Sequence, residues 1–152
     1  MTTYDSTTGS AGSFLSKDSN RTFIWSQNVN LQTEATALTS AGYFASADII
    51  QLVDIPAYTW IKAAGLIVTT AEGDTLTLSL GDEDQAAGFV SAANGNTTAN
   101  AHAQVAQAYG ANTAIGRVYT SADTLDLTIA SLGSQLSHAC VVTVWAECSR
   151  IR

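Results

Sequence analysis

The sequence has little charge, almost no proline and no long apolar run. Lys, Arg, Asp and Glu make up 12% of its 152 residues, against about 25% in an average soluble domain. Its single proline excludes collagen-like and proline-rich linker classes, and no apolar run approaches the roughly 18 residues of a membrane span. Hydrophobic residues nevertheless reach 46%, so the chain has enough apolar surface to fold, and its length suits one domain.

Basic residues are scarcer than acidic ones. Six Lys and Arg against 13 Asp and Glu give a net charge of −7, which phosphate backbones and anionic membranes repel. We therefore expect neither nucleic acid nor a membrane as a partner. Ala, Thr, Ser, Asn and Gln take the place of charged side chains, and such a surface costs little to desolvate. This composition predicts permanent association, as a homo-oligomer or within a larger assembly.

The sequence also lacks a secretory signal and a cysteine pair that could form a disulfide. The first ten residues lack a basic start followed by an apolar stretch, so we expect no secretory signal and a cytoplasmic protein. Cys140 and Cys148 lie eight residues apart in one expected strand, which is about 26 Å at about 3.3 Å per residue and too far for a disulfide. We predict free, buried thiols. Their spacing fits no metal or redox motif, and we expect no metal and no cofactor.

Alternating apolar and polar residues, typical of β-strands, dominate the rest of the chain. Strands are expected at residues 22–31, 48–55, 58–70, 75–80, 115–119, 124–129 and 139–148. Leu76, Leu78 and Leu80 face inward in the most regular of these strands. A turn at 71–74 predicts that 58–70 and 75–80 form a hairpin, and Gly65 predicts a bulge or a close backbone approach.

Other segments are less regular. Residues 34–47 are Ala-rich enough for one or two helical turns, and 81–115 is expected to be a long loop of the kind that is usually functional. Within that loop, 100–109 suits either a helix or a strand at an interface. Seven or eight antiparallel strands without a long amphipathic helix predict an all-β fold, an antiparallel, jelly-roll-like β-sandwich in preference to an up-and-down barrel. The sandwich domain is expected to span 22–152, after an extended N-terminal arm at 1–21.

No residue pattern indicates catalysis. The chain lacks a Gly-x-Ser-x-Gly nucleophile motif, and we expect a non-enzymatic protein. Its acidic cluster, Gly81 to Asp84, favours a solvated turn over a cation site because it lacks the EF-hand spacing. Asp54 and Asp126 are expected to point outward from their strands, which does not favour a catalytic carboxylate pair. The three tryptophans lie in apolar strands, which favours the core or a subunit interface over a sugar-binding platform; they are Trp25, Trp60 and Trp145.

Four motifs follow one another in a recognisable order. Asp48 to Ala57 reads D-I-I-Q-L-V-D-I-P-A, and Val68 to Gly73 reads V-T-T-A-E-G. A Gly-Asp step at 81–82 has Gly-Phe nearby at 88–89, then Tyr119 to Thr128 reads Y-T-S-A-D-T-L-D-L-T, before a valine-rich last strand. In this order, over residues 48–148, the chain resembles small virion structural proteins of tailed bacteriophages. The motifs are turns and strands, so the resemblance carries over no active-site residue.

The resemblance implies a capsid decoration or cement protein. Such a protein binds the major capsid protein on the outer surface of the head lattice, and we expect a homotrimer that is located in the virion after assembly in the host cytoplasm. The arm is then the expected capsid contact, through Phe14, Leu15 and Arg21. The alternative is a receptor- or glycan-binding head-fibre or tail protein. Its expected binding surface lies on the 81–115 segment and includes Phe89, Asn94 and Asn96.

Overall fold

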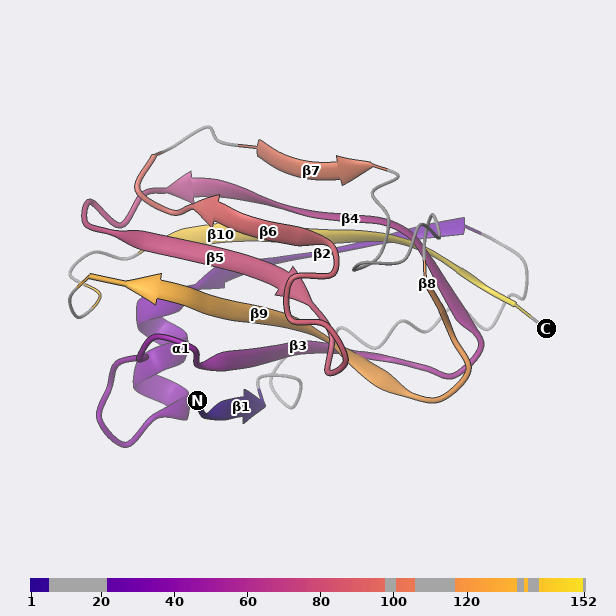
Figure 1. Cartoon of the computed structure of the whole chain (residues 1–152), viewed down its shortest axis with the longest axis horizontal. Coiled ribbons are helices and arrows are strands. Elements are labelled where there is room, and N and C mark those ends of the chain that lie inside the picture. Colours follow the sequence, from indigo (N-terminus) through magenta and orange to yellow (C-terminus); the bar gives the residue numbers. More distant parts are fainter. Residues whose placement is uncertain (6–21, 98–100, 106–116, 134–135, 137–139, 152) are drawn as a thin grey trace.

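Two β-sheets packed face to face form the fold. The computed structural model describes residues 1–5, 22–97, 101–105, 117–133, 136 and 140–151, and within them ten strands form two five-stranded sheets (Figure 1). Sheet I has the order β1-β3-β9-β5-β6, with strands Thr3–Asp5, Ile49–Ile55, Asp123–Leu132, Leu76–Gly81 and Val90–Asn94. Sheet II has the order β2-β10-β4-β7, with strands Thr22–Asn30, Val141–Arg150, Thr59–Thr70 and Ala101–Val105, and β8 (Arg117–Tyr119) also pairs with β4. The predicted all-β sandwich is confirmed.

The core lies between the two sheets, where the alternating apolar residues point. Leu76, Leu78 and Leu80 of β5 are at most 1% exposed, as their spacing predicts. On the opposite sheet, Val142 and Val144 of β10 are fully buried. Full burial of one such side chain stabilises the fold by about 1.5–3 kcal/mol, so these inward rows fix which face of each strand meets the core.

The predicted hairpin at 58–70 and 75–80 is wrong. Its two strands, β4 and β5, belong to different sheets, so the connection between them crosses the sandwich. That connection is tied to the turn after β6, because the backbone N–H of Glu72 donates to the carbonyl of Gly95 at 3.0 Å. Each strand buries its apolar row whether the other lies beside it or opposite it, so alternation alone does not distinguish the two arrangements.

Two local predictions also need correction. A bulge at Gly65 is wrong, because the register of β4 is regular there, with Gly65 opposite Trp145. The register shifts lie instead at Val141/Val142 and Glu147/Cys148 of β10. Residues 81–115 are not one long loop, because they contain β6 and β7; β7 settles the choice between helix and strand for its own five residues. In β3 a register shift between Gln51 and Val53 lets adjacent residues Leu52 and Val53 both be buried.

The described residues include one short helix, α1 (Leu31–Leu38), which follows β2 directly at one end of the sandwich (Figure 1). It begins earlier than the 34–47 segment predicts, because the side-chain Oδ1 of Asn30 accepts from the backbone N–H groups of Gln32 and Thr33, each at 3.1 Å. Among the described residues, no helix has the length and apolarity needed to cross a membrane.

Both cysteines are free and buried, as predicted. Burial in an apolar environment raises the pKa of the Cys140 thiol to about 11 and that of Cys148 to about 12, with smaller contributions from Glu72 and Glu147 respectively. Because the thiolate is the reactive form, these side chains behave as small hydrophobic residues of the core.

Candidate functional site

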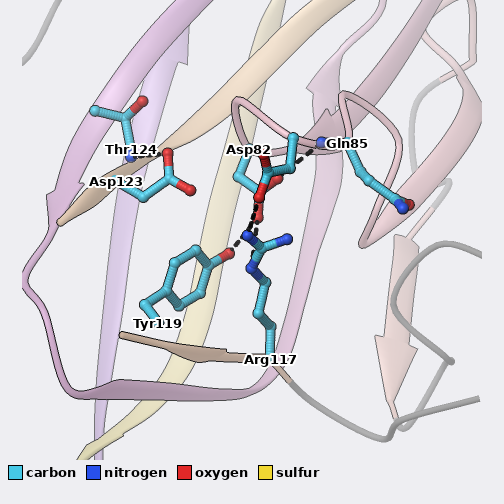
Figure 2. A network of polar contacts seen from close by, with 7 residues as sticks. Asp82, Gln85, Arg117, Tyr119, Asp123 and Thr124 are labelled. Carbon is cyan, nitrogen blue, oxygen red and sulfur yellow. Dashed lines mark hydrogen bonds and ion pairs between the residues drawn. The ribbon is translucent and has the colours of Figure 1, made fainter. Parts of the chain in front are cut away.

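A polar network closes one end of the sandwich, where the end of β5 approaches β8. Asp82 follows β5 directly, and Figure 2 shows Arg117 and Tyr119 reaching toward it from β8. The Tyr119 hydroxyl donates to Oδ2 of Asp82 at 2.6 Å, and the backbone N–H of Gln85 donates to Oδ1 at 2.9 Å. Nε of Arg117 lies 3.5 Å from the same carboxylate. Asp82 therefore joins sheet I to sheet II.

Burial dominates the electrostatics of this network. It raises the pKa of Asp82, although the Tyr119 hydroxyl, the Gln85 N–H and Arg117 all act in the opposite direction. It also raises the pKa of Tyr119, and the neighbouring Asp82 adds to that effect. A second carboxylate, Asp84, pairs with Arg117 at the surface. A carboxylate with this many donors is held in place, which suits a structural tie.

Asp126 lies on the outward face of β9 but is not solvated. Asp126 is only 3% exposed. Burial raises the pKa of its carboxyl group to about 7, and the nearby Asp123, Asp82 and Glu83 add to this shift. Thr124 donates to its Oδ1 at 2.7 Å. The expected outward direction is correct for Asp126, but the exposure that it implied is wrong. Asp54, by contrast, is exposed as predicted.

The acidic cluster behaves in two ways. Glu83 and Asp84 are exposed, as a solvated turn predicts, whereas Asp82 is 2% exposed and belongs to the network above. In the part of the chain that the structure describes, no group of three or more His, Cys, Asp or Glu side chains is arranged to hold a metal ion. No local sequence pattern indicates the network, because Asp82 lies 35 residues from Arg117 and 37 from Tyr119 along the chain. The three side chains meet only when the two sheets pack.

The residues predicted to contact a capsid or a receptor differ in where the structure places them. Phe14, Leu15 and Arg21 lie outside the described residues. Phe89 is 7% exposed and packs in the core, so it offers almost no surface to a receptor. Asn94 and Asn96 are exposed, but their side-chain oxygens accept from backbone N–H groups and shape the turn after β6.

A second feature is the outer face of sheet II, which carries large apolar side chains. Its members are Ile24, Trp60, Ile67, Val118 and Trp145. Ile24 is 73% exposed and Val118 50% exposed, whereas the other three are half-buried. Trp60 lies opposite Val118, and Trp145 lies opposite Gly65, so the apolar surface continues across neighbouring strands.

The charges on this face compensate each other. Nζ of Lys62 lies 5.2 Å from the ring centre of Trp60 and 3.9 Å from a carboxylate oxygen of Glu147. The face is therefore close to neutral on a chain with a net charge of −7. Of the three tryptophans, Trp25 packs against the core, and Trp60 and Trp145 lie outside it. Large half-exposed aromatic residues on a neutral face are typical of a protein interface.

Comparisons with known proteins bear on the fold. No family model and no curated protein matches this sequence. A chain in the capsid of Ralstonia phage GP4 matches in structure with a TM-score of 0.59 and 13% identity, over 91% of this chain and 90% of that chain. A chain of the cyanophage Pam1 capsid asymmetric unit matches with a TM-score of 0.54 and 16% identity, over 94% and 96%. At these identities the likeness shows a shared fold.

Proposed function

We propose that this chain is a non-enzymatic structural protein of a tailed-phage virion, which binds the outer surface of the head as a decoration or cement protein. The observation that carries the proposal is the structural match, nearly end to end, with chains found in two phage capsids. The motifs between residues 48 and 148 favour the same class on separate grounds, since the match in structure does not depend on sequence identity.

The path of the chain supports the proposal. From β1 to β5 each successive strand lies in the other sheet, and the chain crosses again between β6 and β7, between β8 and β9 and between β9 and β10. Such repeated crossing is what a double-sheet jelly roll requires, and jelly rolls are a common architecture of viral capsid domains. We infer a jelly roll with two additional short strands, β1 and β8.

The outer face of sheet II is the surface that we assign to the capsid. Its partner is the major capsid protein, and burial of Trp60, Trp145 and Val118 supplies the favourable free energy. A protein that binds the assembled lattice but not its separate subunits stabilises the shell by mass action. Association as a homotrimer strengthens this effect, because one trimer contacts several capsid subunits at a high effective concentration.

The experiment compares two substitutions to lysine. Val118→Lys places a charge on the outer face of sheet II, at a residue that is 50% exposed, and Ser91→Lys places the same charge on an exposed residue of sheet I. Each purified variant is added to capsids that were assembled without this protein, and the fraction of binding sites that it fills is measured. We expect Val118→Lys to lower that fraction at least several-fold, and Ser91→Lys to leave it unchanged. Equal occupancy of both variants would exclude this face as the capsid contact.

Receptor or glycan binding is the second candidate function. The exposure of Asn94 and Asn96 and the partial exposure of Trp60 favour it, because sugar rings stack on aromatic side chains and sugar hydroxyls accept hydrogen bonds from amides. Glycan-array binding that is lost in Trp60→Ala, with the fold retained, would favour this function. Cryo-EM of particles containing the protein separates the two, since cement predicts symmetric density on the head and a receptor protein predicts density at a fibre or tail.

A further inference from the structure

The five edge strands among the described residues differ in how well they are protected. β1 and β8 have three residues each, and β6 and β7 have five each. β6 is also irregular, with a register shift against β5 and a positive φ of 56° at Ala92. β2, in contrast, has nine residues and pairs with β10 without a register shift. β2 is thus the long, regular edge among the described strands.

The sequence of β2 contains none of the features that prevent edge-to-edge pairing. Soluble proteins protect exposed edges with Lys, Pro, bulges or very short strands. β2 reads T-F-I-W-S-Q-N-V-N, without a charged residue, a proline or a glycine. A neutral, regular strand of about 30 Å, at about 3.3 Å per residue, is a template for a further strand.

The hydrogen-bond pattern shows which residues of β2 offer this template. The N–H of Leu31 donates to the carbonyl of Cys140 at 2.9 Å, one pair beyond Asn30 and Val141. Hydrogen-bonded pairs alternate along an antiparallel ladder, so the odd-numbered residues of β2 bond to β10. The N–H and C=O groups of Ile24, Ser26 and Asn28 point away from β10, and the side chains of the same residues are exposed.

We propose that β2 pairs in antiparallel fashion with β2 of a second copy of this chain, about a twofold axis at Ser26. In this register Ser26 lies opposite Ser26, and Ile24 lies opposite Asn28, so the pairs that would form the new backbone hydrogen bonds join residues whose N–H and C=O groups point away from β10. The strand is therefore complementary to itself. The residues of β2 carry no charge, so pairing along this strand brings no like charges into contact between two chains of net charge −7.

The inward side of β2 fits the same occupant. Phe23, Trp25 and Gln27 point between the sheets and yet stay half-buried, because β2 is the last strand of its sheet. Oε1 of Gln27 is buried and accepts no hydrogen bond from the described residues. A second strand beside β2 would bring polar groups within reach of that acceptor.

This contact goes beyond the function proposed above. An isologous contact closes at two copies, so it is distinct from the trimer and would join copies that belong to neighbouring trimers. A continuous sheet across two copies adds backbone hydrogen bonds to any lattice-mediated contact. The contact is measurable on the isolated protein, so its outcome does not depend on whether the capsid role is correct.

Cysteine cross-linking tests the register. In the proposed pair the two Cα atoms of residue 26 are about 5.5 Å apart, within the range of about 4.4–6.8 Å for a disulfide. Two copies of residue 24 are four positions apart along the strands, about 13 Å. We expect Ser26→Cys to form a disulfide-linked dimer under mild oxidation, and Ile24→Cys and the unmodified chain to stay uncross-linked, since Cys140 and Cys148 are fully buried.

A second pair of variants tests the contact without cross-linking. Ser26→Lys brings two like charges together at the twofold axis, and Ser26→Thr keeps the strand neutral at the same position. We expect Ser26→Lys to weaken dimerisation about fivefold, as a like-charge cross-strand pair does, with Ser26→Thr unchanged in analytical ultracentrifugation. Cross-linking at residue 24 as efficient as at residue 26, or no cross-linking at either residue, would overturn the proposal.

Discussion

The two outer faces of the sandwich differ in a way that solvent exposure alone does not predict. On sheet I the outward residues Ser79, Asp126 and Thr128 are polar, yet none is more than 9% exposed. On sheet II the outward residues Trp60 and Trp145 are apolar and remain partly exposed. An isolated soluble domain is expected to bury its apolar residues and solvate its polar ones, so each face needs its own explanation.

The chain itself covers the outer face of sheet I. A Cβ atom at Gly81 would lie 1.9 Å from the carbonyl oxygen of Gln85, so the turn after β5 rests directly on Gly81, which pairs with Asp126. Ser79 accepts a hydrogen bond from the N–H of Ala92 at 3.2 Å. Ser79 and Asp126 are thus hydrogen-bonded within the chain, whereas Oγ1 of Thr128 is buried without a hydrogen-bond partner among the described residues. On sheet II, Trp60 and Trp145 stay partly exposed.

The largest expected effect comes from Gly81→Ala, which removes the cover of sheet I. The added methyl group would overlap backbone atoms of Gln85 and Ala86. These atoms cannot move aside by a side-chain rotation, so the whole turn would have to shift. We expect a loss of about 3 kcal/mol or more in the free energy of unfolding, at the upper end of overpacking effects. Gly133→Ala is the matched control, because its methyl group comes no closer than 3.0 Å to any atom and meets only the exposed side chains of Thr75 and Asp74, so it should cost clearly less in urea unfolding.

The next effect is a pH dependence due to Asp126. The pKa of this carboxyl is about 7 in the folded chain against an ordinary 3.8, so the folded state binds more protons between these values. Its contribution to stability is complete below about pH 4 and is lost as the pH rises through about 7. This difference in pKa corresponds to a contribution of at most about 4 kcal/mol to the free energy of unfolding. Contact of the carboxyl group with solvent reduces that contribution to about 1–3 kcal/mol.

Unfolding curves from pH 4 to pH 8 test this assignment. Asp126→Asn keeps the acceptor for Thr124 and removes the titration, so the variant should gain stability relative to the unmodified chain as the pH rises. Asp54→Asn, at an exposed position, should follow the unmodified chain at every pH. Parallel curves for Asp126→Asn and the unmodified chain would contradict the buried assignment.

The tie between the sheets gives a smaller effect. Tyr119→Phe removes the hydroxyl that donates to Asp82 at 2.6 Å and leaves a buried carboxylate with fewer donors. We expect a loss of about 1–2 kcal/mol in unfolding free energy. Tyr43→Phe serves as the control because Tyr43 is 39% exposed, and it should change stability by no more than a few tenths of a kcal/mol. An equal effect of the two substitutions would argue against the tie.

The sequence predicts what depends on neighbouring residues and misses what depends on the path of the chain. Alternation is enough to place Leu76, Leu78 and Leu80 in the core, because every arrangement of the strands buries the same row. It does not predict that β4 and β5 lie in different sheets. The burial of Asp126 depends on the turn at Gln85, which is 41 residues away along the chain, so no local pattern could reveal it.

The smallest expected effect tests whether the outer face of sheet II is exposed in the isolated protein. Ile24→Thr changes a residue of sheet II that is 73% exposed, and Ile129→Thr makes the same change at a fully buried residue of sheet I. The first should alter the unfolding free energy by no more than about 0.5 kcal/mol, while the second should cost several times more, because it leaves a hydroxyl in the core. If Ile24→Thr destabilises the isolated monomer as much as Ile129→Thr does, then the monomer itself covers Ile24. In that case the outer face of sheet II does not need a partner to bury its apolar residues. If Ile24→Thr is neutral in the monomer and destabilising only in the assembled state, the apolar residues of this face owe their contribution to association.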